Sequence, residues 1–185
     1  EAKSRRAEAE AFTKFLNVTL ASVDPTEARG QEFTVKQMLE QAAAKIDASL
    51  RAQPLVEATL RLTIGNTFRA LGKYTAAEPH LRTALKVRKE RLGEENLEVA
   101  DALTDLAALL DAQGHYDAAE PLFRDALRIR RKLLGDEHEL IAECLTNVGI
   151  QLWRRGNLDG AEPLWREALA MRRKLLGDEH PLVAD

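Results

Sequence analysis

Two histidines stand in acidic surroundings that could hold a divalent metal. His138 ends an Asp-Glu-His triplet at 136–138, and an identical triplet ends at His180. Imidazole and carboxylate groups are common ligands of zinc and related ions. The two triplets lie 42 residues apart, however, and equivalent loops of a repeating structure lie one full repeat apart. They cannot converge on one ion, so we predict no metal site and no cofactor. Helix capping and hydrogen bonds between repeats are the expected roles.

Cys144 is the single cysteine and the obvious candidate nucleophile. Leu145 and Val148 follow it in a helical pattern, which predicts a small buried residue. The sequence also lacks Gly-x-x-x-x-Gly-Lys-Ser/Thr, His-Glu-x-x-His and Cys-x-x-Cys. We therefore predict a chain that is not an enzyme. One cysteine excludes an internal disulfide, and with no signal peptide at the start the predicted location is cytoplasmic.

Basic residues gather in three clusters that are also 42 residues apart. Each cluster ends an apolar run and precedes an acidic loop, so the cations would offset a helix dipole and pair with that loop. Alternatively, the clusters form a basic ridge for an anionic membrane surface or an acidic filament. The net charge of −3 argues against nucleic acid as a partner. The ridge candidates are Arg88, Lys89, Arg130, Arg131, Arg172 and Arg173.

The 42-residue step recurs along the chain from about residue 54 and predicts a repeat architecture. Leu-Gly occurs at 92–93, 134–135 and 176–177, and Ala-Glu-Pro occurs at 77–79, 119–121 and 161–163. Apolar residues at 99–110 follow helical spacing, Gly114 interrupts them, and a second helical run follows. Each repeat is therefore a helical hairpin, with the proline in the first turn of its second helix.

The predicted organisation is a short stack of such hairpins with a helical cap. Residues 1–53 fit the period poorly and predict a degenerate N-terminal hairpin that covers the end of the array. Val183 matches Val99 and Ile141, which predicts a further repeat. The predicted domains are the cap at 1–53, repeats at 54–95, 96–137 and 138–179, and the start of a truncated repeat at 180–185.

The second repeat carries a recognisable pattern: Leu106-Ala107, Leu110, Gly114-His115-Tyr116, Ala119, Phe123 and Ala126. This pattern resembles the tetratricopeptide repeat (TPR), although the third copy has Leu158 where tyrosine is usual. The units exceed the usual ~34 residues. Their Leu-Gly-Asp-Glu-His loops are similar to those of the kinesin light chain class. The resemblance implies an all-α, right-handed α-solenoid whose first helices line a concave groove.

By this resemblance the chain is a protein-interaction scaffold that binds a peptide or protein partner in the groove. Bacterial members of the kinesin light chain class imply a tubulin-like filament as partner, with linkage to membrane. The sequence does not specify an oligomeric state. By family analogy the groove residues are Asn66, Arg69, Asp101, Thr104, Asp111, Glu143, Thr146, Trp153 and Arg154.

Trp153 is the groove residue that most favours an interaction site. Adjacent helical residues point in different directions, so Trp153 and Leu152 cannot both face the core, and Leu152 takes the core position. An exposed tryptophan beside an arginine is typical of an interaction hot spot. The alternative is that Trp153 packs against the first helix of the next repeat. Trp165, at a position shared with Leu81 and Phe123, is predicted to be core.

A second function is also open. The N-terminal stretch, with 53–58 and 63–65, resembles the region that follows the kinase domain in certain bacterial serine/threonine kinases. The alternative is therefore a C-terminal sensory or substrate-docking TPR region of a membrane-anchored kinase.

Overall fold

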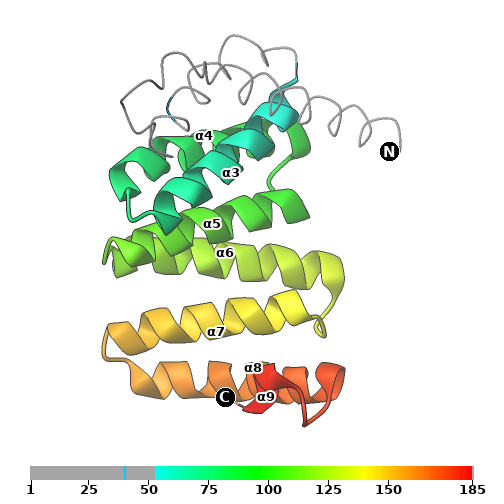
Figure 1. Ribbon diagram of the computed structural model, residues 1–185. Helices are drawn as coiled ribbons and strands as arrows, with labels where there is room; N and C mark the ends of the chain where they lie inside the picture. The colour runs from blue at the N-terminus through cyan, green and yellow to red at the C-terminus, as the bar shows by residue number, and fades with distance from the viewer. Residues whose placement is uncertain (1–39, 41–52, 185) are drawn as a thin grey trace, which may run out of the picture. The chain divides into compact units, whose positions relative to one another are not determined.

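The computed structural model describes residue 40 and residues 53–184, and the regular secondary structure of this part of the chain is all helical (Figure 1). The predicted cap at 1–53 lies outside the described residues, apart from residues 40 and 53. The helices are α3 (Pro54–Ala70), α4 (Tyr74–Leu92), α5 (Leu97–Ala112), α6 (Tyr116–Leu134), α7 (Glu139–Arg154), α8 (Leu158–Leu176) and α9 (Pro181–Ala184).

Side chains at one repeated position cap the starts of α5, α7 and α9. The Asn96 carboxamide accepts a hydrogen bond of 2.8 Å from the backbone N–H of Glu98 at the start of α5. His138 Nδ1 accepts one of 3.1 Å from the N–H of Leu140, and His180 Nδ1 accepts one of 3.2 Å from Leu182. These bonds satisfy backbone donors that the first turn of a helix leaves unpaired. The predicted capping role of both histidines is confirmed.

Glycines end the helices with a left-handed turn. Gly114 has φ of 81°, a conformation that residues with a Cβ resist. Its N–H donates to the Asp111 carbonyl at 2.9 Å, and the N–H of His115 donates to the Leu110 carbonyl at 2.8 Å. This pairing closes the last turn of α5 and reverses the chain into α6. The predicted role of glycine at these breaks is confirmed.

The repeated prolines lie deeper in the second helices than the sequence suggests. α6 begins at Tyr116, so Pro121 is its sixth residue and lies inside the helix. Pro79 and Pro163 are placed in the same way in α4 and α8. The prediction of a first-turn proline was wrong because each second helix starts five residues before its proline, at Tyr74, Tyr116 or Leu158. Pro121 therefore leaves the Asp117 carbonyl without its helical donor.

The chain divides into two compact units between Val87 and Arg88, inside α4. In the first unit, α3 packs on α4: the ring of Phe68 stacks on His80 with centroids 5.9 Å apart. In the second unit, α5 contacts α6, α6 contacts α7 and α7 contacts α8. Figure 1 shows these four helices of the second unit as successive layers.

Small residues permit the close approach of paired helices in the second unit. Ala119 and Ala126 on α6 are fully buried, as predicted from their repeated positions. On α7, a Cβ added to Gly149 would lie 2.7 Å from Cδ1 of Trp165, so the indole packs directly on the helix backbone. The indole N–H of Trp165 also donates to the Thr146 carbonyl at 3.3 Å. Trp165 is half-buried rather than fully enclosed in the core.

Candidate interaction site on the first helices

α5 and α7 of the second unit each bury one side and expose the other. α5 buries Leu103 and Leu110, and α7 buries Leu145 and Leu152. The opposite side of both helices is polar apart from Ala108, Ile150 and Trp153. We call it the first-helix face: Glu98, Asp101, Thr104, Asp105, Ala108 and Asp111 on α5, and Glu139, Glu143, Thr146, Asn147, Ile150, Trp153 and Arg154 on α7.

A buried arginine from α6 links the two helices. Arg130 is only 3% exposed, and its Nη2 donates to Asp101 Oδ1 on α5 at 2.8 Å. Its Nη1 reaches α7, where it lies 3.0 Å from Cys144 Sγ and 3.4 Å from the Leu140 carbonyl oxygen. Burial acts to lower the pKa of Arg130, but the bonds to Asp101 and Cys144 outweigh it and raise the pKa above its usual value. The guanidinium is therefore a permanent cation between successive repeats.

Cys144 is fully buried beneath this arginine. Burial raises the pKa of its thiol, and the neighbouring Arg130 offsets the rise only in part. A nucleophilic cysteine needs the opposite environment, because the thiolate is the reactive form. The predicted role of a small buried residue is confirmed. In the described residues no group of three or more His, Cys, Asp or Glu side chains is arranged to hold a metal ion.

A second polar cluster joins the C-terminal ends of α5 and α7. Asp111 accepts a hydrogen bond of 2.7 Å from Gln151 Nε2 and a second from Arg154 Nη1. The guanidinium of Arg154 also lies over the ring of Tyr116, 5.0 Å from its centroid, where a cation–π attraction operates. Two of the predicted groove residues, Asp111 and Arg154, are thus partners that bind consecutive repeats together.

Trp153 lies on the first-helix face beside this cluster. Its side chain is 55% exposed, whereas the adjacent Leu152 is 9% exposed and belongs to the core. The sequence prediction of which of the two faces inward is confirmed. Trp153 is therefore a large apolar surface at the end of α7, next to ordered polar groups.

The other predicted groove residues have local partners. Thr104 and Thr146 donate hydrogen bonds to the carbonyls four residues earlier, each at 2.9 Å. Glu143 approaches Arg130 at 4.0 Å. Asn66 and Arg69 lie on α3 in the first unit, where Arg69 Nε donates to Asn66 Oδ1 at 3.3 Å.

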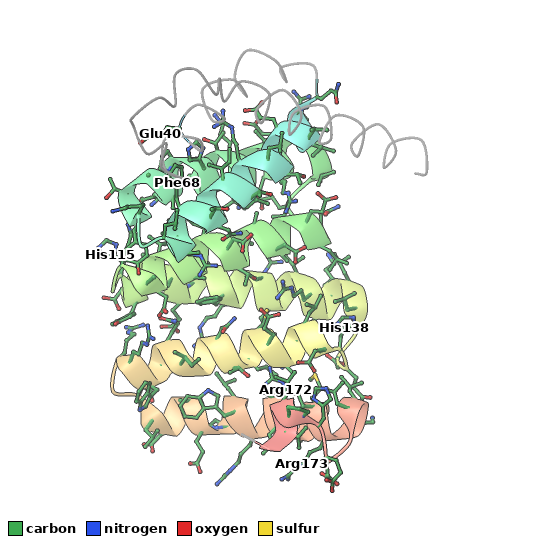
Figure 2. The ribbon with its side chains drawn as sticks, in the orientation of Figure 1. Glu40, Phe68, His115, His138, Arg172 and Arg173 are labelled. Carbon is green, nitrogen blue, oxygen red and sulfur yellow. The ribbon has the colours of Figure 1, made fainter. Side chains whose placement is uncertain are left out.

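The predicted basic ridge is wrong for its most buried members. Arg88 and Arg130 are 7% and 3% exposed, and each reaches a backbone carbonyl at the start of the following first helix. Arg172 lies at the equivalent position (labelled in Figure 2). It donates to Glu139 Oε1 at 3.0 Å. A rotation of about 100° per helical residue separates these arginines from their neighbours in sequence. Arg130 therefore holds successive repeats of the second unit together, and neither Arg88 nor Arg130 is exposed enough to contact a membrane or filament.

The second residue of each basic cluster is accessible but paired. Lys89 lies 3.8 Å from Glu94, Arg131 lies 2.5 Å from Glu167, and Arg173 lies 3.4 Å from Asp178. Exposed pairs of this kind contribute at most about 1 kcal/mol each. These three residues are the ridge candidates that stay on the surface.

Gln151 is a site residue that the sequence analysis missed. It is 1% exposed, and its amide bridges α7 to Asp111 on α5. The sequence did hold a sign of this role. Helical spacing from Leu145 and Val148 predicts an apolar residue at position 151, yet the residue there is a polar glutamine. A buried polar residue needs a partner, and this one finds it in the preceding repeat.

Among the described residues no helix is long and apolar enough to cross a membrane.

Two family profiles described as Tetratricopeptide repeat match residues 56–132 and 141–182. No curated protein matches the chain. Among solved structures, the fold is similar to BtubC (BKLC) from P. vanneervenii, with TM-score 0.70 and 20% identity over 97% of this chain and 72% of that one.

Two further structures share the fold. A kinesin light chain of P. anserina with nearly identical TPR-like repeats has TM-score 0.68 and 19% identity over 98% of this chain and 77% of that chain. The TPR domain of Arabidopsis FLU has TM-score 0.57 and 22% identity over 66% of this chain and 98% of that domain.

The predicted all-α TPR fold is confirmed by these matches, and TPR domains are scaffolds that bind proteins or peptides. The 42-residue hairpins, their capping residues and the family profiles together show that the chain belongs to the tetratricopeptide repeat family, with structural similarity to its kinesin-light-chain-like members.

Proposed function

We propose that this chain is a non-enzymatic adaptor that binds a peptide or protein segment on the first-helix face, with Trp153 as its main apolar contact. The observation that carries the proposal is the 55% exposure of Trp153 on a helix whose other large apolar residues are mostly buried. Tryptophan is among the residues most enriched at binding hot spots, because it offers a large apolar area with few rotatable bonds.

The polar links between α5 and α7 support a binding role for this face. Arg130 bridges Asp101 to α7, and Asp111 holds Gln151 and Arg154. These two separate bridges hold the side chains of Asp101, Asp111 and Arg154 in place before a partner arrives. A surface that is already ordered loses less conformational entropy on binding, which favours affinity.

The partner we propose is a bacterial tubulin-like filament. The basis is the fold shared with BtubC (BKLC) from P. vanneervenii and with the P. anserina kinesin light chain. In this proposal linkage to an anionic membrane uses the accessible basic residues Lys89, Arg131 and Arg173. The buried arginines take no part.

Co-sedimentation of the chain with filaments of bacterial tubulin, and with vesicles containing anionic lipid, tests both parts at two salt concentrations. Trp153→Ala should keep its melting temperature and weaken filament binding by about 2 kcal/mol, roughly thirtyfold. Leu158→Ala is the matched control, because Leu158 on α8 is also 55% exposed but lies off the first-helix face. Equal loss in both variants, or a large loss of stability with intact binding in Trp153→Ala, would contradict the proposal.

A further inference from the structure

We infer that the segment bound on the first-helix face is basic: it places a lysine or arginine against Asp101 and Glu143 and an apolar side chain against Trp153. This inference rests on the proposed function and adds the chemistry of the partner. It is drawn from the charges and contacts of α5, α6 and α7 within the second unit.

Arg130 lies near two carboxylates at once, those of Asp101 and Glu143. Its Nη2 is 2.8 Å from Asp101 Oδ1, whereas its closest approach to Glu143 is 4.0 Å. The side chains of Asp101 and Glu143 are 51% and 46% exposed, while that of Arg130 is 4% exposed. Arg130 thus satisfies Asp101 from beneath and leaves the outer side of both carboxylates facing solvent. A cation arriving from solvent meets two partly neutralised negative charges.

The cations near Trp153 are already engaged by carboxylates. Arg154 donates to Asp111. Arg155 lies 3.0 Å from Asp117 and also donates to Glu120. Burial acts to raise the pKa of Glu120, but hydrogen bonds from Arg124 and Arg155 outweigh it and lower the pKa, so this carboxylate is ionised at neutral pH.

Acidic side chains dominate the rest of the first-helix face. The carboxylates of Glu98 and Asp101 are half exposed, so an acidic partner would add like charges to this surface. A basic partner would instead be attracted by the carboxylates of this face. The carboxylates of the face are Glu98, Asp101, Asp105, Asp111, Glu139 and Glu143, and the guanidiniums that pair with them include those of Arg88, Arg130, Arg154 and Arg172.

The apolar residues of the face set the spacing of the partner. Ile150 and Trp153 follow Glu143 by seven and ten residues, which places all three on the same side of α7. At about 1.5 Å per helical residue, Trp153 lies roughly 15 Å along the axis from Glu143. An extended segment spans this distance in about four or five residues. The expected segment therefore carries its cation about four or five positions from an aromatic or aliphatic side chain.

The experiment is a selection of phage displaying random dodecapeptides against the immobilised full chain. The expected consensus has Lys or Arg four or five positions from an apolar residue. A synthetic peptide with this consensus should bind at least tenfold more weakly to Glu143→Gln and to Trp153→Ala, and more weakly in high salt for the wild type. Glu162→Gln is the control, because Glu162 is a 55% exposed, arginine-paired carboxylate on α8. Glu143 is chosen over Asp101 because Asp101 holds the buried Arg130 directly.

Three other results would contradict the inference, and they differ in whether the proposed function survives. Selected peptides that are acidic and still require Trp153 would overturn the basic-partner inference and leave the proposed function standing. Basic peptides that bind Glu143→Gln and Glu162→Gln equally well would overturn the inference as general charge attraction. Selected peptides that ignore Trp153→Ala, or no enrichment over the bare support, would overturn both.

Discussion

Gly149→Ala tests the helix packing that orients α7. An added Cβ would lie 2.7 Å from Trp165 Cδ1 and closer still to Nε1, so the indole must move. Overpacking of this kind lowers the free energy of unfolding by about 1–3 kcal/mol. The movement also disrupts the hydrogen bond from Trp165 to the Thr146 carbonyl, whose loss costs about 1 kcal/mol. Alanine recovers about 1 kcal/mol over glycine in a helix interior. The balance is a loss of about 2 kcal/mol in the free energy of unfolding.

The preceding repeat supplies the matched control. Its equivalent residues are Ala107 and Phe123, both buried, so an alanine fits against a phenylalanine in the same hairpin geometry. In a Trp165→Phe background Gly149→Ala should therefore be stabilising by about 1 kcal/mol, the helix-propensity gain alone. The two substitutions should couple by about 2–3 kcal/mol in a double-mutant cycle.

Urea unfolding followed by far-UV circular dichroism measures all four proteins of this cycle. The reasoning is refuted if Gly149→Ala has the same effect in both backgrounds. It is also refuted if Gly149→Ala stabilises the wild type, because the indole would then have room to move.

Three further predictions concern other contacts. Ala126→Leu should lower stability by about 1–3 kcal/mol in the same urea assay, because Ala126 is fully buried between paired helices; a silent change would mean that the helix faces another way. Asn96→Ala should cost about 1 kcal/mol through loss of the cap to Glu98, and Asn96→Asp should retain it; equal loss in both would exclude capping. Native Cys144 should resist a thiol reagent at neutral pH and react only on unfolding, because it is buried and its pKa is raised; rapid reaction of the folded chain would contradict this.

Local and periodic features were readable from the sequence. The hairpins, the glycine turns and the capping histidines depend on residues within one or two helical turns, so spacing alone predicts them. Helical geometry predicted that Leu152 faces the core and that Trp153 therefore faces solvent, and the exposure of the two side chains agrees. The proline position was mispredicted because the tyrosine at the start of α6 extends the helix by one turn.

The contacts between repeats were decided only by the tertiary structure. Sequence spacing treated Arg130 and Arg131 as members of one basic cluster, yet Arg130 is buried against α5 and α7 while Arg131 is accessible. Gln151 reaches Asp111 across 40 residues of sequence. The sequence by itself determined the repeat, the helices and the TPR family. The packing of successive hairpins decides which charged side chains are buried and which face solvent. Sequence periodicity predicts the helices but not how one helix packs on the next, and burial depends on that packing.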